Sequence, residues 1–313
     1  MKTKDILGCV GWATFFIFAS FWIPFVGPFF SLLTPLPFLY YSIRLGFPAG
    51  VKLAIMTVLV VSFISTQIGQ PQIIFVSVEL SLLGLALSEL FYRKLSLGHT
   101  IFFATVIMLL LGLGCLFFIS LSKNMGPLEM MRDYLEGHLQ VAIKVYEEMG
   151  MAQENANELK TYITTFTEYI FRIFPSLMIV GSGFTVWLNI IIAKPLFRSK
   201  NLKYPDFVQS DRWRTPEGLI WGVIISGFAL FVSSGSIESL AINALIVMSV
   251  IYLFHGLSIL LFFLNKYRFP SWIRMGVYFL IIIQQLFFVV LALAGLFDQW
   301  VDFRKIYNRK KAE

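Results

Sequence analysis

The amino-acid sequence predicts an all-helical bundle that crosses a membrane eight or nine times. Hydrophobic residues make up 58% of the 313 residues and charged residues only 14%. Soluble domains are about 45–50% apolar and about 25% charged. The chain also holds 33 Phe and seven Trp, more large aromatic side chains than one soluble core can bury. These three observations indicate a polytopic membrane protein.

Nine apolar segments are candidates for membrane-crossing helices, because about 20 apolar residues span the hydrocarbon core. They are residues 6–25, 29–43, 48–66, 72–91, 100–121, 163–193, 217–232, 239–264 and 276–297. No small-residue cleavage site follows the first segment before Pro24, so we expect it to be retained rather than removed as a signal peptide. The second is short and contains Pro35 and Pro37, which predict a kinked helix or a half-helix.

The distribution of Lys and Arg predicts how the chain is oriented. Basic loops alternate with uncharged or acidic ones, such as residues 67–72, and this places the N-terminus and the loop 194–216 in the cytoplasm. If all nine segments cross, the basic loop 265–275 lies inside and the basic tail outside. If 217–232 is re-entrant, the two exchange sides. Each choice breaks the positive-inside rule once, so eight and nine spans both stay open.

On this interpretation the chain has six regions. They are the first five spans (1–121), an extracytoplasmic amphipathic insertion (122–162), the sixth span (163–193), a basic cytoplasmic loop (194–216), the C-terminal membrane helices (217–297) and a basic tail (298–313). The insertion holds seven of the 18 acidic residues. Helices that lie on a membrane surface are usually basic, so a cap over the bundle is favoured over a lipid-lying helix. A solvated linker without a role in binding is the alternative.

No motif for catalysis, for a cofactor or for a metal is present. The sequence lacks GxxxxGK[ST], GxGxxG and HExxH, and no Ser/His/Asp set or carboxylate pair stands out. Two Cys and three scattered His do not have the spacing of a zinc site. The net charge of +7 is explained by Lys and Arg kept on the cytoplasmic side, not by nucleic acid. The chain is therefore expected not to be an enzyme.

Glu79 is the leading candidate for a ligand contact. It lies about seven residues, or about 10 Å, into its span, and no basic residue is three or four positions away. An unpaired charge in hydrocarbon costs at least about 2.5 kcal/mol. We therefore expect Glu79 either to serve a ligand or proton site or to hydrogen-bond a neighbouring helix as a carboxylic acid.

Four further polar residues are candidate ligand contacts. His255, Asn189 and Gln284 lie within predicted spans, where a bond between helices is the simpler role and a ligand contact the second. Gln284 and Gln285 are adjacent, and neighbouring helical positions diverge by about 100°, so at least one should face protein. Thr34 belongs to the proline-broken second span, which we place near the site.

Two pairs have the spacing of helical ion pairs. Glu89 precedes Arg93, and Glu168 precedes Arg172, by four residues, which is the favoured order. Both are expected to be structural.

Three stretches resemble the YybS-like family of predicted bacterial membrane proteins. They are TPLPFLYYSIRLGFPAG (34–50), HGLSILLFFL (255–264) and GLFDQWVDFRK (295–305), and the order of spans also fits. The function of that family is uncharacterised. Its six N-terminal spans are similar to the S components of energy-coupling-factor vitamin transporters. The resemblance implies a bacterial cytoplasmic-membrane protein with an outward-opening ligand cavity among the first six helices, and no catalytic residues.

The chain departs from S components in its first helix. Those proteins dock on their transmembrane partner through an Ala-xxx-Ala strip, whereas this helix has Gly8, Gly11, Ala13 and Ala19. It is also longer, by the insertion and the C-terminal spans. Docking on the usual energising module is therefore not implied.

Two functions follow as hypotheses. The first is non-catalytic binding or translocation of a small, apolar or aromatic solute that enters beneath the 122–162 cap, close to Glu79. The second is a structural or regulatory subunit in the lipid bilayer that binds a protein partner or self-associates, through small-residue strips or the basic loop 194–216. A polar-lined pocket would favour the first, and a filled bundle with an exposed Gly/Ser strip the second.

Overall fold

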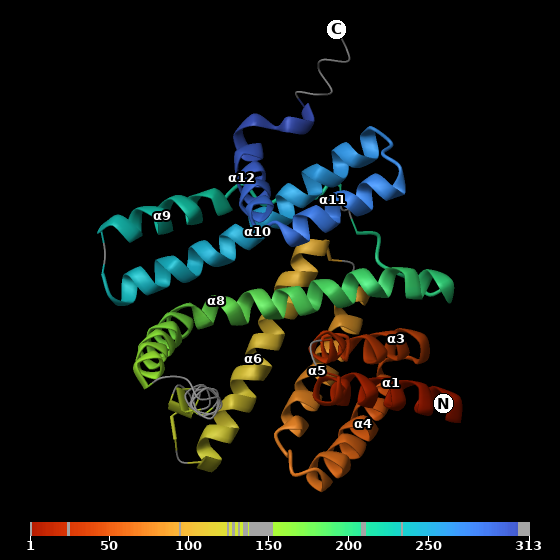
Figure 1. Cartoon of the computed structure of the whole chain (residues 1–313). Helices are drawn as coiled ribbons and strands as arrows, with labels where there is room; N and C mark the ends of the chain where they lie inside the picture. The colour runs from red at the N-terminus through yellow and green to blue at the C-terminus, as the bar shows by residue number, and fades with distance from the viewer. Residues whose placement is uncertain are drawn as a thin grey trace. The chain divides into compact units, whose positions relative to one another are not determined.

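In the computed structural model, the chain is described over residues 2–23, 26–93, 95–123, 153–207, 211–232 and 234–305, with a few positions between 125 and 137. These residues form eleven helices and no strand (Figure 1). The helices are α1 (Thr3–Trp22), α2 (Gly27–Ser31), α3 (Pro35–Leu45), α4 (Phe47–Gln67), α5 (Ile73–Tyr92), α6 (Leu97–Lys123), α8 (Gln153–Ser199), α9 (Leu219–Val232), α10 (Ser236–Lys266), α11 (Ser271–Ile283) and α12 (Leu286–Val301). The predicted all-helical fold is confirmed.

Five of the described helices are long and apolar enough to cross a membrane. They are α4, α5, α6, residues 165–199 of α8, and α10, and the bent pair α11 and α12 would make a sixth. The protein is thus a polytopic helical membrane protein. The predicted spans at 6–25, 29–43 and 217–232 are not among these helices. The last of them corresponds to α9, whose 14 residues extend only about 21 Å.

The second predicted span is broken, as its prolines indicated. It consists of α2, with five residues, and α3, with 11, and Pro35 is the first residue of α3. Proline is favoured at this position because its missing N–H would have no partner in the first turn. The break leaves the carbonyl groups near Leu32 in need of other partners.

The continuous helix predicted over 276–297 is wrong. The chain turns by 105° between α11 and α12. Gln284 ends α11 with extended backbone dihedrals, and the side chains of Gln284 and Gln285 are both exposed, so neither faces protein as expected. The turn allows α12 to run closely along α10, a contact that a straight helix through these residues could not make.

The chain forms two compact units. The N-terminal unit comprises residues 1–163 and 181–207, and the C-terminal unit comprises residues 164–180 and 208–313. Helix α8 contributes residues 153–163 and 181–199 to the N-terminal unit and residues 164–180 to the C-terminal unit. Most of the predicted insertion 122–162 and the end of the tail lie outside the described residues, although α8 already begins at Gln153.

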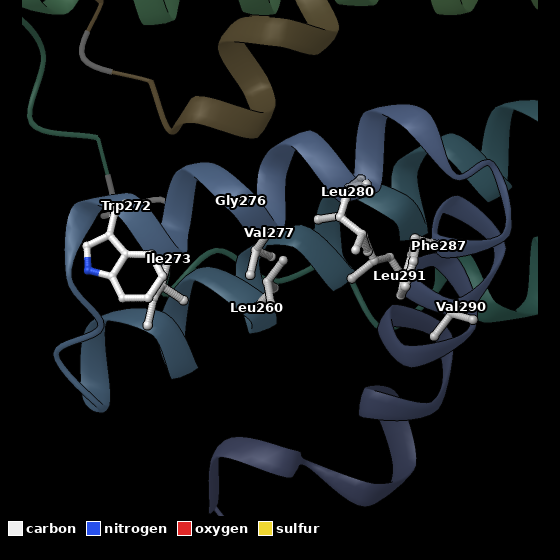
Figure 2. Close-up of a pocket in the computed structure, with 10 residues that line it drawn as sticks. Leu260, Trp272, Ile273, Gly276, Val277, Leu280, Phe287, Val290 and Leu291 are labelled. Carbon is white, nitrogen blue, oxygen red and sulfur yellow. The ribbon is translucent and has the colours of Figure 1, made fainter.

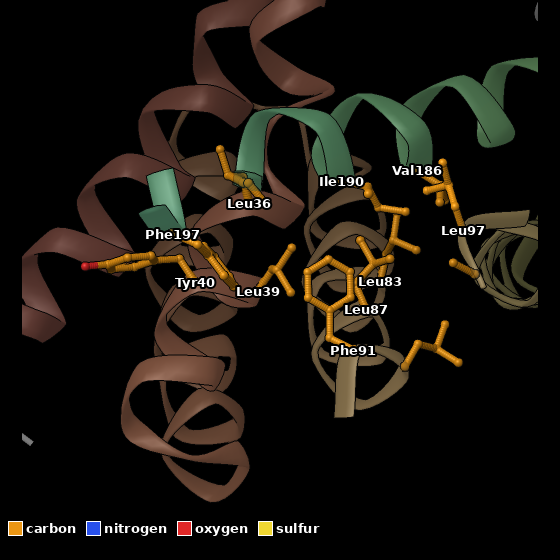
Figure 3. Packing of buried hydrophobic residues seen from close by; sticks show 13 residues of the cluster. Leu36, Leu39, Tyr40, Leu83, Leu87, Phe91, Leu97, Val186, Ile190 and Phe197 are labelled. Carbon is orange, nitrogen blue, oxygen red and sulfur yellow. The ribbon is translucent and has the colours of Figure 1, made fainter. Parts of the chain in front are cut away.

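An apolar cluster forms the core of the N-terminal unit (Figure 3). It joins side chains of α3, α5, α6 and α8, among them Leu39, Leu83, Ala104, Ile190 and Phe197, all 0% exposed. Helix α5 also carries a strip of small residues, which are all buried: Ser77, Ser81, Gly84 and Ser88. A methyl group on Gly84 would collide with the carbonyl oxygen of Pro35, so the close packing of α3 on α5 requires glycine there.

Two glycines bring α10 and α12 together in the C-terminal unit. A Cβ atom on Gly256 would collide with the backbone of Leu291, and one on Gly295 with the carbonyl oxygen of Tyr252. The two helices therefore touch backbone to backbone. These glycines belong to the stretches 255–264 and 295–305, which the sequence singled out separately.

Candidate functional site

Asn189 is hydrogen-bonded to the chain at the break between α2 and α3, two residues before Thr34. Asn189 lies on α8, and its Nδ2 donates hydrogen bonds to the carbonyl oxygen of Leu32 at 2.7 Å and to that of Thr185 at 2.8 Å. The amide thus satisfies a carbonyl group that the break sets free. The predicted role of Asn189 as a bond between helices is confirmed.

Buried oxygen atoms at this position keep no partner. Within the described residues, neither Thr34 Oγ1 nor Asn189 Oδ1 has a hydrogen bond, although both residues are 0% exposed. The same is true of Ser77 Oγ on α5 and Thr105 Oγ1 on α6. An unsatisfied buried polar group costs about 1–3 kcal/mol, so such atoms favour the entry of water or of a polar group of a ligand.

Glu79 belongs to the same unit but faces a different surface. It lies on α5, is partly buried, and points at α6, where a Cβ atom on Gly112 would be 3.1 Å from Glu79 Oε1. No ion pair or hydrogen bond to its carboxylate is recorded among the described residues. Gly112 leaves space for the carboxylate between the two helices. The contact of Glu79 with a ligand stays a prediction.

His255 occupies the most polar part of the C-terminal unit. It is 2% exposed on α10, its Nδ1 is hydrogen-bonded to Thr215 Oγ1 at 2.8 Å, and its ring meets Trp213 edge to face. Its Nε2 lies 3.2 Å from Oδ2 of Asp298 on α12. This second contact has the distance of an ion pair but not the angle of a hydrogen bond. Asp298 Oδ1 accepts the N–H of Phe303 at 2.9 Å.

Arg304 extends this cluster around the chain segment that precedes α9. It is 6% exposed, and its guanidinium donates to the carbonyl oxygens of Asp211 at 3.2 Å and Trp213 at 3.1 Å. Ser258 Oγ on α10 donates to the same Trp213 oxygen at 2.9 Å. These hydrogen bonds hold the segment 211–215 against both α10 and the residues that follow α12.

A second, more exposed ion pair closes the cluster. Asp302 has left-handed backbone dihedrals after α12 and accepts two hydrogen bonds from Arg214, at 2.9 and 3.1 Å. Partial burial alone would raise the pKa of the Asp302 carboxyl. The hydrogen bonds from Arg214 and from the N–H of Lys305, together with the charge of Arg214, outweigh it and hold the pKa below its usual value.

Sequence reasoning proposed His255 but not its partners. Thr215 lies 40 residues before it and Asp298 43 residues after it, so no local spacing joins them. The available signal was an Asp within an apolar segment, which demands a partner. Gln284 is in the same unit but at the exposed turn between α11 and α12, apart from the cluster.

One of the two predicted ion pairs is confirmed, and the other is replaced by a different pair. Arg93 Nε lies 3.2 Å from Glu89 Oε1, as the spacing indicated. Arg172 instead pairs with Glu238 of α10 at 2.8 Å and donates to Ser239 Oγ at 3.0 Å. The structure therefore pairs Arg172 with a carboxylate of the neighbouring helix and not with Glu168.

Two open grooves in the described residues are apolar. One, of about 390 Å³, lies along α1 and is lined by Leu7, Gly8, Gly11, Trp12 and Phe15. The other, of about 540 Å³, lies between α10, α11 and α12. Neither corresponds to the polar-lined pocket that would favour solute binding. In the part of the chain that the structure describes, no group of three His, Cys, Asp or Glu side chains could hold a metal ion.

Comparison with known proteins gives the chain a family. It is similar to the uncharacterized protein YybS of Bacillus subtilis (strain 168), with 20% identity over 289 residues, which cover 90% of this chain and 91% of that protein. No solved structure matches. The model of a family described as predicted membrane protein (DUF2232) matches residues 12–299. The chain therefore belongs to the DUF2232 family of predicted membrane proteins.

Proposed function

We propose that the protein is a non-catalytic membrane protein whose N-terminal unit binds a small, apolar or aromatic solute in an S-component-like helical bundle. The observation that carries this proposal is the α2–α3 break, where Asn189 bonds Leu32 O, and where Thr34 Oγ1 and Asn189 Oδ1 are buried without a partner among the described residues. A broken helix at membrane depth is tolerated where it is buried in protein or lines a cavity.

The surroundings of the break suit the solute class. The core of the unit is apolar, and about two helical turns further along α3 and α8 it contains edge-to-face contacts of Tyr40, Phe91 and Phe197. Small-molecule sites combine an apolar lining with a few polar groups that orient the ligand. The two oxygens at the break would supply those groups.

A pair of threonine variants tests this proposal. Thr34→Val removes a hydroxyl that has no partner among the described residues, while Thr57→Val, the matched control, removes an equally buried one that donates to Leu53 O at 2.9 Å. Native mass spectrometry of protein extracted gently from its own membrane would detect any co-purified small molecule. We expect the wild type and Thr57→Val to carry this molecule, and the amount bound to Thr34→Val to be at least about ten-fold lower.

The outcomes separate the possibilities. Equal retention by both variants would remove the break as the binding site. A wild-type protein without any small molecule would contradict solute binding. Glu79→Gln, tested in the same way, would show whether that carboxylate takes part.

A second candidate function rests on the groove along α1. Exposed Leu7, Trp12 and Phe15 border a hollow at Gly11, where a Cβ atom would meet nothing within 4 Å. Small residues that let helices approach closely are typical of lateral contacts in membranes. A protein partner or second copy docked here would make the chain a structural or regulatory subunit. Trp12→Ala should then abolish a stoichiometric complex in native mass spectra, while Trp221→Ala, an equally exposed tryptophan on α9, should not.

A further inference from the structure

The C-terminal unit carries a groove whose shape and lining suit a hydrocarbon chain (Figure 2). The groove has a volume of about 540 Å³ and no charged lining side chain. Its lining comes from Leu260 on α10, from Trp272, Ile273, Gly276, Val277, Leu280 and Ile281 on α11, and from Phe287, Val290 and Leu291 on α12.

One end of this groove carries more basic than acidic side chains, since Asp211, bonded to Asn265, is the carboxylate recorded beside three basic residues there. Trp272 and Ile273 mark the end where the chain leaves α10 and enters α11, and residues 265–275 there contain three basic side chains and no acidic one. Arg274 holds the connection in shape, because it donates to Phe269 O, Asn265 Oδ1 and Leu264 O. Lys266 and Arg268 are exposed on the same connection.

The dimensions match one leaflet of a bilayer. Helix α11 has 13 residues and is about 20 Å long, and its lining side chains from Trp272 to Leu280 extend over about 12 Å. The hydrocarbon region of one leaflet is about 15 Å thick.

We infer that this groove is a binding site for an anionic phospholipid. One acyl chain lies between α10, α11 and α12, and the phosphate group faces the basic connection at residues 266–274. Charge favours this occupant over a neutral lipid, since basic residues near the membrane surface attract anionic headgroups. The inference is independent of the solute site proposed for the N-terminal unit, because all of its residues belong to the C-terminal unit.

The experiment compares lipids on the purified full-length protein. Delipidated protein is titrated with phosphatidylglycerol, with phosphatidylcholine of the same acyl chains, and with glycerol 3-phosphate, and native mass spectrometry counts the bound molecules. We expect phosphatidylglycerol to bind at least about ten-fold more tightly than phosphatidylcholine, and glycerol 3-phosphate not to compete.

Two variants test the two parts of the site. Gly276→Phe fills the groove, and it should fold because a Cβ atom at Gly276 meets nothing within 4 Å. It should lower phosphatidylglycerol binding at least about ten-fold, whereas Gly227→Phe, at an equally open helical glycine on α9, should leave binding unchanged. Arg268→Asn removes one charge while keeping a residue that tolerates the left-handed backbone at φ 51.

Arg268→Asn should reduce the preference for phosphatidylglycerol about five-fold. Arg198→Asn, an exposed arginine at the end of α8, is the control and should leave the preference unchanged. Equal binding of both lipids, or full binding by Gly276→Phe, would overturn the inference. Competition by glycerol 3-phosphate would also overturn it, since the ligand would then be a soluble phosphate and not a lipid.

Discussion

Two asparagines, Asn189, which is buried, and Asn243, which is partly buried, show how the two units of the molecule differ. Asn243 of the C-terminal unit uses both ends of its amide. Its Oδ1 accepts the N–H of Ser176 at 2.8 Å, and its Nδ2 donates to the carbonyl oxygens of Arg172 and Ser239, both at 2.7 Å. Asn189 of the N-terminal unit uses only Nδ2, and its Oδ1 stays without a partner among the described residues.

The two units also differ in the kind of polar group that they bury, although each keeps buried atoms without a hydrogen bond among the described residues, such as His255 Nε2 and Arg304 Nε in the C-terminal unit. In the C-terminal unit, ionisable side chains such as His255, Asp298 and Arg304 are buried, and they bind each other or the segment 211–215. In the N-terminal unit, the buried polar groups at the α2–α3 break are a hydroxyl and an amide. A buried charge is far more costly than a buried hydroxyl, so it persists only with partners. We therefore assign the ionisable cluster a structural role, and the neutral groups at the break are those of the proposed binding site.

The largest effect is expected from a substitution within the ionisable cluster. Asp298→Ala removes the carboxylate that lies 3.2 Å from His255 Nε2 and leaves the N–H of Phe303 without its acceptor, so it should lower the free energy of unfolding by about 3–5 kcal/mol. SDS-induced unfolding in mixed micelles measures this. Thr34→Val, which removes a hydroxyl without a partner, serves as the counterpart in the other unit and should change stability by less than about 1 kcal/mol. Equal losses in both variants would contradict the comparison.

A methyl group at the crossing of α10 and α12 should have the next largest effect. Gly256→Ala forces Cβ into the backbone of Leu291 and should cost about 3 kcal/mol in the same unfolding assay. Gly276→Ala, at an open position on α11, should instead be neutral or stabilise by up to about 1 kcal/mol, because alanine is the better helix former. If Gly256→Ala were as stable as the wild type, the close contact of these helices would be in error.

Alanine substitutions of the two asparagines test the difference between the units directly. Asn243→Ala removes three hydrogen bonds and should destabilise the protein by about 2 kcal/mol, whereas Asn189→Ala removes two and should cost about 1 kcal/mol. The difference is measured by thermal unfolding in lipid nanodiscs. A larger loss for Asn189→Ala in ligand-free protein would mean that its Oδ1 already has a partner.

The smallest change in stability is expected from a substitution of Asp302, at the edge of the ionisable cluster. Its pKa is held below the usual value of about 3.9, so its stabilising contribution is complete above that pH and is lost as the pH falls through the lowered pKa. Asp302→Asn should cost about 0.5 kcal/mol at pH 6, and its difference from the wild type should shrink towards pH 3. Arg214→Gln should remove the same pH dependence. A difference that does not change with pH would show that this carboxylate contributes no charge-dependent stability.

Much of the fold could be predicted from local sequence, but some expectations failed for a shared reason. The break at Pro35 and the ion pair of Glu89 with Arg93 were predicted correctly, because a missing N–H and a four-residue spacing act within one helix. The turn at Gln284 and the pairing of Arg172 with Glu238 were not predicted. Both depend on a neighbouring helix that the sequence does not reveal.

Hydropathy and proline placement were enough to predict a helical membrane protein and the break at Pro35, although not the turn at Gln284. Hydropathy and proline act on each segment alone, so no knowledge of the other helices is needed. Only the tertiary structure decided that Asn189 reaches Leu32, 157 residues away, and that Gly256 and Gly295 bring His255 to Asp298. In lipid, apolar surface alone does not choose between partners, so close backbone contacts and the need to satisfy buried polar groups select which helices meet.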